Sequence, residues 1–91
     1  MKIAITGHTE GIGLEIAQWM HARGHTVQGF SRTTGHDIRD DAVLSRIVDE
    51  CVDADIFFNN ATHEFQQTKL LFLLHQAWQD QHRTIVNISS S

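Results

Sequence analysis

The sequence predicts one α/β domain over residues 1–91, a compact three-layer sandwich with a small parallel sheet of four to five strands between helices. Short apolar runs rich in β-branched residues alternate with longer segments in which apolar residues recur at helical spacing. Strands that alternate with helices are typical of parallel sheets, because a parallel connection needs a crossover. The chain has six glycines and no proline, so glycine marks the strongest breaks between elements.

The first half of the chain is expected to contribute two strands and two helices. Residues 2–6 (KIAIT) and 25–30 form the apolar runs of the strands. After a polar segment in which residues 37–38 are expected to add a very short strand, Asp40 is a predicted N-cap for an amphipathic helix that reaches about residue 52. Residues 11–23 predict a helix that stops at Gly24 and carries an apolar face of Ile12, Ile16 and Trp19 or Met20.

The second half predicts a strand, a helix and a last strand. Residues 55–59 (DIFFN) are a short apolar run between polar residues, which is typical of a strand buried on both faces. Residues 84–88 (TIVNI) form the last strand. The long helix over residues 64–81 has apolar side chains on more than one side, which a helix that covers one sheet does not need. This helix is therefore expected to have a second partner.

Composition argues against several classes of partner. Eleven acidic residues and seven basic ones give a net charge of −4, which disfavours a nucleic-acid partner. No run approaches the ~20 apolar residues of a membrane span, and the N-terminus lacks the pattern of a secretory signal. The single cysteine, Cys51, cannot form an internal disulfide. We therefore expect a cytoplasmic protein that binds neither nucleic acid nor membranes.

The stretch TGHTEGIG, residues 6–13, joins the first predicted strand directly to the first predicted helix. Glycines at positions 7, 11 and 13 permit a tight turn and let a ligand approach the backbone. The first amides of the helix and its dipole favour negative charge. A nucleotide phosphate is therefore the expected ligand, although a strand-to-helix turn that is merely tight would need similar residues.

Three motifs together resemble the short-chain dehydrogenase/reductase family. TGHTEGIG is similar to the TGxxxGIG cofactor motif of that family, FFNNAT (57–62) to its NNAG motif, and TIVNISSS (84–91) to the strand end that carries its catalytic serine. The motifs follow one another in family order and span the chain. The resemblance implies the N-terminal, cofactor-binding half of this family, with a Rossmann-like fold and NADP or NAD as the cofactor.

The resemblance also implies roles for particular residues. The glycines at 7, 11 and 13 would flank the phosphates, so that a side chain at 13 would block their approach, and Ile12 would pack the helix start against the sheet. Asp37 would bond the adenine amino group. Residues 59–61 would line the adenosine ribose and support the central strand, and Thr62 stands where the family has glycine. The expected cofactor-binding residues are Thr6, Gly7, His8, Thr9, Glu10, Gly11, Ile12, Gly13, Ser31, Arg32, Asp37, Ile38, Asn59, Asn60 and Ala61.

The choice of cofactor is expected to be made where the second strand ends, beside the 2′-position of the adenosine ribose. Ser31 and Arg32 stand there without an acid, and a guanidinium next to a hydroxyl suits a phosphate. Glu10 argues the other way, because NADP-dependent members of the family often carry a basic residue at the matching position. On balance we expect NADP to be favoured over NAD.

The catalytic part of the resemblance is incomplete. The family uses a tyrosine and a lysine in a YxxxK motif after the serine, whereas this sequence has no tyrosine, and Lys2 and Lys69 both precede the serine segment. Ser90 matches the catalytic serine, but a hydroxyl without an acid is only a partial site. Complete family catalysis within these residues is not expected. No metal site is predicted from the loop histidines His8, His36 and His63.

Three functions are compatible with these residues. The leading one is a minimal module that binds NAD(P)(H). The second is a reduced oxidoreductase that acts as an oligomer and uses Ser90 with a loop histidine, and the third is a structural or assembly remnant of the family. We also expect a homo-oligomer, a dimer or tetramer, because the helix over 64–81 has surplus apolar surface and the strand over 84–88 would present an open edge.

Overall fold

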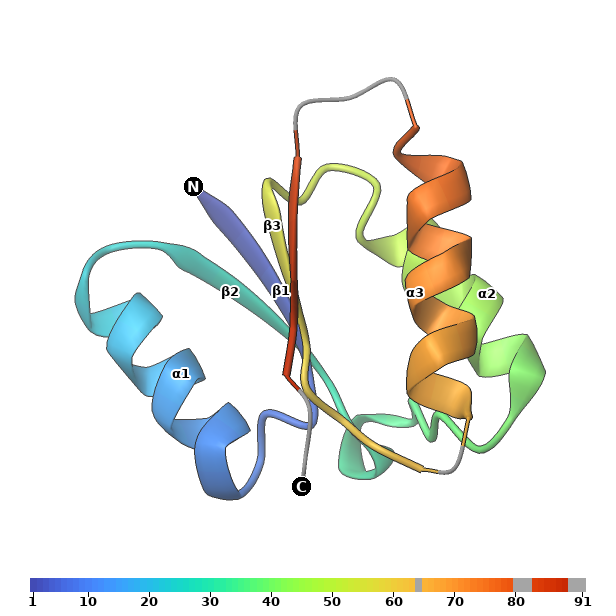
Figure 1. Ribbon diagram of the computed structural model, residues 1–91. Coiled ribbons are helices and arrows are strands. Elements are labelled where there is room, and N and C mark those ends of the chain that lie inside the picture. The colour runs from blue at the N-terminus through green and yellow to red at the C-terminus, as the bar shows by residue number, and fades with distance from the viewer. Residues whose placement is uncertain (64, 80–82, 89–91) are drawn as a thin grey trace.

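The computed structural model describes residues 1–63, 65–79 and 83–88. Within them, four parallel strands form one sheet in the order β2-β1-β3-β4: β1 (Lys2–Thr6), β2 (Thr26–Phe30), β3 (Ile56–Asn59) and β4 (Thr84–Asn87). Helix α1 (Gly11–Ala22) lies on one face of the sheet, and α2 (Asp41–Glu50) and α3 (Gln66–Ala77) lie on the other (Figure 1). The three-layer α/β fold predicted from the sequence is confirmed, with four strands.

The order of the strands places a crevice at one edge of the sheet. The chain leaves β1 toward β2 on one side and later returns to add β3 and β4 on the other. Connections that leave neighbouring strands in opposite directions diverge at the carboxyl ends of those strands, and this is where ligands bind in open parallel sheets. The segments after β1, β2 and β3 are therefore brought to one place.

The segment between β2 and α2 differs from the prediction. Residues 37–38 do not form a strand; a short 3₁₀ helix, η1 (Arg32–Thr34), is followed by a loop. Polar groups of this loop find partners within the loop and on α3. Arg39 bonds the carboxylate of Asp37, and the side chain of Gln66 on α3 donates to the Ile38 carbonyl at 2.6 Å. The Asp40 N-cap of α2 is confirmed, because its carboxylate accepts from the Ala42 amide at 2.9 Å.

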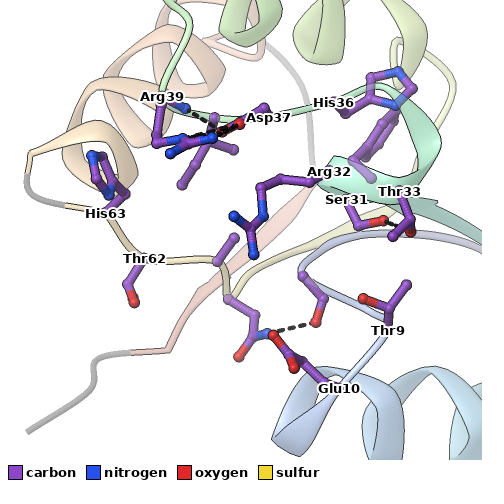
Figure 2. Close-up of a pocket in the computed structure, with 15 residues that line it drawn as sticks. Thr9, Glu10, Ser31, Arg32, Thr33, His36, Asp37, Arg39, Thr62 and His63 are labelled. Atoms are coloured by element: carbon purple, nitrogen blue, oxygen red, sulfur yellow. Dashed lines mark hydrogen bonds and ion pairs between the residues drawn. The ribbon is translucent and has the colours of Figure 1, made fainter.

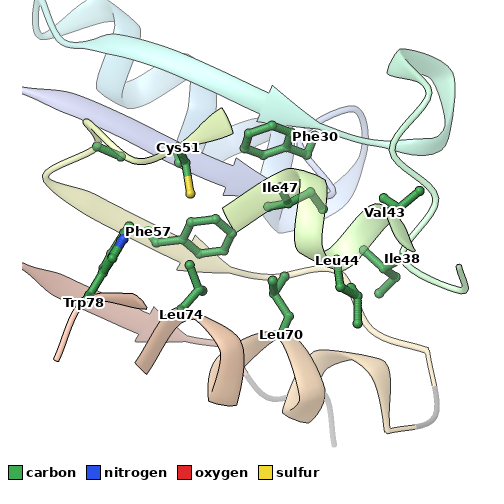
Figure 3. Close-up of a cluster of buried hydrophobic side chains, with 12 residues drawn as sticks. Phe30, Ile38, Val43, Leu44, Ile47, Cys51, Phe57, Leu70, Leu74 and Trp78 are labelled. Carbon is green, nitrogen blue, oxygen red and sulfur yellow. The ribbon is translucent and has the colours of Figure 1, made fainter. Parts of the chain in front are cut away.

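The largest cluster of buried apolar side chains lies between the sheet and helices α2 and α3 (Figure 3). Phe57 of β3 contacts Trp78 edge to face, with ring centroids 6.2 Å apart. Cys51 is fully buried here, and burial raises the pKa of its thiol to about 11. The helices contribute Val43, Leu44, Ile47, Leu70 and Leu74.

Helix α1 packs on the opposite face with a stripe that matches the predicted one in part. Gly13 is buried, and the half-buried residues follow it at helical spacing: Ile16, Ala17 and Met20. Ile12 and Trp19 are 60% and 54% exposed. The expectation that Ile12 packs the helix start against the sheet is wrong, because the close approach of Gly13 sets the rotation of the helix about its axis.

Helix α3 has apolar side chains on more than one side, as predicted. Leu70, Leu74 and Trp78 are buried, whereas Phe72 is 66% exposed on the outer surface. The predicted ends of this helix, residues 64 and 81, lie outside the described residues. In the part of the chain that the structure describes, no helix has the length and apolar character needed to cross a membrane.

The side chain of His8 occupies a notch in the sheet. A Cβ at Gly29 would overlap three atoms of the His8 ring, so the imidazole lies directly on the backbone of β2. Gly29 pairs with Ile5 of β1, in the strand from which the turn that carries His8 departs. The glycine therefore allows the turn after β1 to lie close to the neighbouring strand.

Two substitutions on α3 test which of its faces is the core. Leu74→Ala is expected to lower the free energy of unfolding by about 2–5 kcal/mol, because it removes a fully buried side chain. Phe72→Ala, on the exposed side, is expected to change the free energy of unfolding of the monomer by no more than about 0.5 kcal/mol. Urea denaturation of both variants measures the difference, and similar losses in the two would contradict this placement of α3.

A pair of substitutions tests the notch at Gly29. Alanine in a strand is ordinarily more favourable than glycine, but Gly29→Ala should destabilise the fold by about 1–3 kcal/mol because its Cβ meets the His8 ring. Adding His8→Ala to the same chain should restore most of that loss, since it removes the ring. Denaturant titration of the wild type, both single variants and the double variant gives the coupling energy. Additive effects would show that the two residues do not contact each other.

Candidate functional site

The turn after β1 is tied to the loop after β3. The hydroxyl oxygen of Thr6 accepts hydrogen bonds from the amides of Asn60 and Ala61, each at 3.1 Å. The side-chain amide of Asn60 donates to the carbonyl of Gly7 at 3.1 Å, and the Gly7 amide donates to the carbonyl of Phe30 at 2.8 Å. These bonds hold the ends of three neighbouring strands together.

The glycines of the turn are required for different reasons. Gly7 has φ of 71°, and a Cβ there would lie 3.0 Å from the Asn60 side-chain nitrogen. A Cβ at Gly13 would overlap the carbonyl oxygen of Gly7. A side chain at 13 would therefore meet the protein itself before any ligand, which corrects the expectation that it would block the approach of a phosphate. Gly11 has φ of 60°, and a Cβ there would meet no atom within 4 Å.

The first turn of α1 leaves backbone N–H groups without a partner inside the helix. Glu10 is the N-cap in extended conformation, and among the described residues its side chain makes no capping hydrogen bond. The Leu14 amide bonds to the Glu10 carbonyl, so the amides before it keep free donors in the manner of helix N-termini. Together with the helix dipole, they favour an anion at this end of α1.

A cavity of about 570 Å³ opens at the carboxyl edge of the strands (Figure 2). Three segments line it: the glycine turn, the segment after β2 and the loop after β3. The cavity brings together nine of the residues that were expected to bind the cofactor: Gly7, Thr9, Glu10, Ser31, Arg32, Asp37, Ile38, Asn60 and Ala61. It also includes six that were not in that set: Phe30, Thr33, His36, Arg39, Thr62 and His63.

The other predicted residues lie outside this lining. Thr6 and Asn59 are fully buried and serve the framework. The Asn59 side-chain amide donates to the Gln67 carbonyl and to the Asn87 side chain, each at 3.0 Å, so it joins β3 to α3 and β4. The His8 ring lies on Gly29. Two further predicted residues, Gly11 and Gly13, belong to the start of α1, and Ile12 is exposed. Ser90 is outside the described residues.

The two arginines of the cavity differ in whether they are paired with a carboxylate. Arg39 binds the carboxylate of Asp37 through two nitrogens, at 3.0 and 2.6 Å. Hydrogen bonds from Arg39, with a smaller contribution from the Arg32 charge, lower the pKa of Asp37 to about 2, so this carboxylate is ionised at neutral pH. Within the described residues, the Arg32 guanidinium has no hydrogen-bond or ion-pair partner, and Figure 2 shows it between the Asp37–Arg39 pair and Glu10.

Polar side chains surround Arg32 on the turn after β2. The hydroxyl oxygens of Ser31 and Thr33 are 2.8 Å apart, and both residues line the cavity. One guanidinium and two hydroxyls thus stand together where the second strand ends. Across the described residues, no group of three or more His, Cys, Asp or Glu side chains is arranged to hold a metal ion.

The residues that the sequence set omitted fall into two kinds. Phe30, Thr33, Arg39, Thr62 and His63 are sequence neighbours of predicted site residues, so a wider window at each strand end would have included them. His36 is also adjacent to a predicted residue, Asp37, but no pattern in the sequence indicates its contact with Glu50, fourteen positions away on α2.

Comparison with known proteins supports the fold through structure rather than sequence. No protein-family model matches the chain. A search of curated proteins finds no match either. A solved structure of a 3-alpha-hydroxysteroid dehydrogenase from Pseudomonas sp. B-0831, complexed with NADH, is similar, with a TM-score of 0.76 and 25% sequence identity. The match covers 99% of this chain and 44% of the dehydrogenase, so the chain spans less than half the length of that protein.

The similarity extends over the strands and helices that form the cavity, because nearly the whole chain is aligned. The glycine turn, the Asn59–Asn60 pair and the last strand also follow one another in the order known from the family. In fold and in motif order the chain is therefore similar to the N-terminal Rossmann half of a short-chain dehydrogenase/reductase.

Proposed function

We propose that this chain is a minimal Rossmann domain, residues 1–91, that binds NAD(P)(H) in the cavity at the carboxyl edge of its sheet. The observation that carries the proposal is the convergence of three segments there: the glycine turn, the Ser31–Arg32 turn and the Asn60 loop. The cavity volume of about 570 Å³ lies in the ordinary range of small-molecule sites. NADH in the similar dehydrogenase agrees with a dinucleotide ligand.

The lining fits the parts of a dinucleotide. The diphosphate would lie against the glycine turn and the first amides of α1, where the backbone is open at Gly11. The adenosine would extend toward the loop after β2, with Asp37 and Ile38 beside the adenine and Asn60 and Ala61 beside the ribose. When bound, a nicotinamide dinucleotide supplies hydride-transfer chemistry, while these residues bind and orient it.

The same geometry supports a preference for NADP over NAD. Arg39 is neutralised by Asp37, whereas Arg32 extends into the cavity beside two hydroxyls. A guanidinium without another partner can bind a 2′-phosphate through charge-assisted hydrogen bonds. Glu10 also lines the cavity and repels a phosphate. The preference for NADP therefore depends on whether the attraction by Arg32 exceeds the repulsion by Glu10.

Binding, rather than turnover by the usual family route, is the activity proposed for these residues. The sequence contains no tyrosine to serve as the proton donor, and its lysines lie at positions 2 and 69. Two alternatives remain: a reduced oxidoreductase that uses Ser90 with a loop histidine, and an assembly remnant that binds no cofactor. His36 and His63 line the cavity, which keeps the first of them open to testing by turnover of NAD(P)H with carbonyl compounds.

Calorimetric titration tests the proposed cofactor and its selectivity. NADPH is expected to bind more tightly than NADH, and Arg32→Ala should weaken NADPH binding by about one to two decades while changing NADH little. Arg23→Ala, which removes an arginine outside the cavity, is the matched control. Failure of the folded wild type to bind either cofactor would refute the function. Tighter binding of NADH would refute the role given to Arg32.

We also propose that the protein forms a homo-oligomer through the helix over residues 64–81. The outer side of α3 has a groove of about 370 Å³ lined by Leu71, Phe72, His75, Gln76 and Gln79. Phe72 lies there with 66% of its surface exposed, and burying such apolar surface against a second copy stabilises both. Strand β4, at the edge of the described sheet, offers a further pairing surface within residues 84–88.

Light scattering at low micromolar concentration tests the oligomer. The wild type should scatter as a multiple of the 10.3 kDa chain, and Phe72→Glu should shift it to the monomer because a charge would be buried in the contact. Ser45→Glu adds the same charge on an exposed position of α2 and should leave the assembly intact. Leu74→Glu is unsuitable for this purpose, because Leu74 is fully buried and a charge at this position would destabilise the fold itself. A monomeric wild type would overturn the proposal.

A further inference from the structure

The turn that presents Arg32 is closed by backbone bonds and by the side chain of Thr34. The amides of Thr34 and His36 donate to the Ser31 carbonyl at 3.1 and 2.8 Å. The Ser31 amide donates to the Thr34 hydroxyl oxygen at 2.9 Å, and that oxygen also lies 2.9 Å from the Ser31 carbonyl. Gly35 then ends the turn with φ of 81°. The Thr34 hydroxyl therefore adds side-chain bonds to a turn whose backbone is already bonded.

His36 connects this hydroxyl to helix α2. Its Nδ1 lies 3.0 Å from the Thr34 hydroxyl oxygen, and its Nε2 lies 2.6 Å from a carboxylate oxygen of Glu50. The ring also contacts Phe30 edge to face, with centroids 4.9 Å apart, and the His36 side chain is 13% exposed. Figure 2 shows His36 beside the turn and directed away from the Arg32 guanidinium.

A count of hydrogens shows that these contacts depend on the protonation of His36. A hydroxyl has one hydrogen, and an ionised carboxylate only accepts. Doubly protonated His36 can donate to both Thr34 and Glu50, so the Thr34 hydrogen is free to bond the Ser31 carbonyl. Neutral His36 that donates to Glu50 can only accept at Nδ1, so Thr34 gives its hydrogen to His36 and its hydroxyl bond to the Ser31 carbonyl is lost.

The charged groups around His36 come from two segments. Helix α2 contributes Glu50, and also Arg46, which donates to the Gly35 carbonyl at 3.3 Å. The segment that contains His36 contributes Arg32 and Asp37, both in the cavity lining. Strand β2 contributes the uncharged ring of Phe30. Glu50 is the charged group that contacts the imidazole directly.

We propose that His36 is a specificity-determining residue, which lets the Thr34 hydroxyl bond the Ser31 carbonyl and so tightens the Ser31–Thr34 turn for a 2′-phosphate when it is protonated, and withdraws that bond when it is neutral. This inference rests on the proposed binding of NADP(H). As the pH rises and His36 loses its proton, the turn keeps its backbone bonds but loses this side-chain bond, and Arg32, Ser31 and Thr33 are less firmly held to bind a phosphate. NADH, which has no 2′-phosphate, does not depend on this turn to the same extent.

The first test compares NADPH and NADH affinities across the range in which histidines titrate, about pH 5 to 8. As the pH rises through this range, the preference of the wild type for NADPH should fall about threefold to tenfold more than that of His36→Gln. This is the effect of one net hydrogen bond. Glutamine keeps a polar group but does not titrate, so its profile records the titration of the 2′-phosphate itself. Glu50→Gln should reduce the pH dependence, because a glutamine amide can donate to Nε2, so that neutral His36 can keep its hydrogen on Nδ1 and still donate to Thr34. Identical profiles in the wild type and His36→Gln would overturn the proposal.

A second measurement needs no cofactor and therefore separates this inference from the proposed function. In NMR spectra of the free protein, the amide resonance of Ser31 should shift with pH together with the ring resonance of His36. The same amide should stop following pH in His36→Gln. A Ser31 amide that does not follow the His36 titration would contradict the coupling, whether or not NADPH binds. Coupling without any NADPH binding would leave the switch in place and refute only its assignment to a 2′-phosphate.

Discussion

The arrangement of the site depends on the attachment of the glycine turn to the loop after β3. Thr6 accepts two backbone amides of that loop, and Asn60 returns a bond to the Gly7 carbonyl. Gly13 must then lack a side chain, because the first turn of α1 lies against that same carbonyl. The position of one peptide group thus fixes the strand end, the direction of α1 and the floor of the cavity.

The distribution of charge in the cavity follows from the loop before α2. Arg39 and Asp37 satisfy each other at a separation of two residues, which leaves Arg32 as the cation directed into the open space. The Arg32 turn is supported from behind by Thr34, His36 and Glu50. The wall of the cavity at this turn therefore has two layers. The first is the set of groups that face the cavity, and the second is the hydrogen-bonded chain from Thr34 through His36 to Glu50 on α2, which supports them.

Most elements were predictable from the sequence because local features decide them, whereas the strand predicted at residues 37–38 is absent and η1 was not predicted. β-branched runs gave the strands, Asp40 gave a helix start, and the parallel order brought the ends of β1, β2 and β3 together. The rotation of α1, which leaves Ile12 exposed, was not predictable, since it depends on the contact between Gly13 and Gly7. Asn59 and Asn60 read alike in sequence, but the pleat of β3 turns the first inward. The contact of His36 with Glu50 depends on tertiary packing.

The two faces of the sheet are unequally covered, and this has a consequence for local unfolding. Helix α1 buries Gly13 completely and three further residues in part, whereas α2 and α3 share a continuous cluster with the sheet. Regions with few buried apolar contacts open at lower free energy than the core, so α1 should exchange its amide hydrogens sooner than α3. An anion held by the first turn of α1 would slow this exchange most, because a ligand protects the segment that must be ordered to bind it. The part of the chain best placed to hold a phosphate is thus also the part whose order would respond most to its presence.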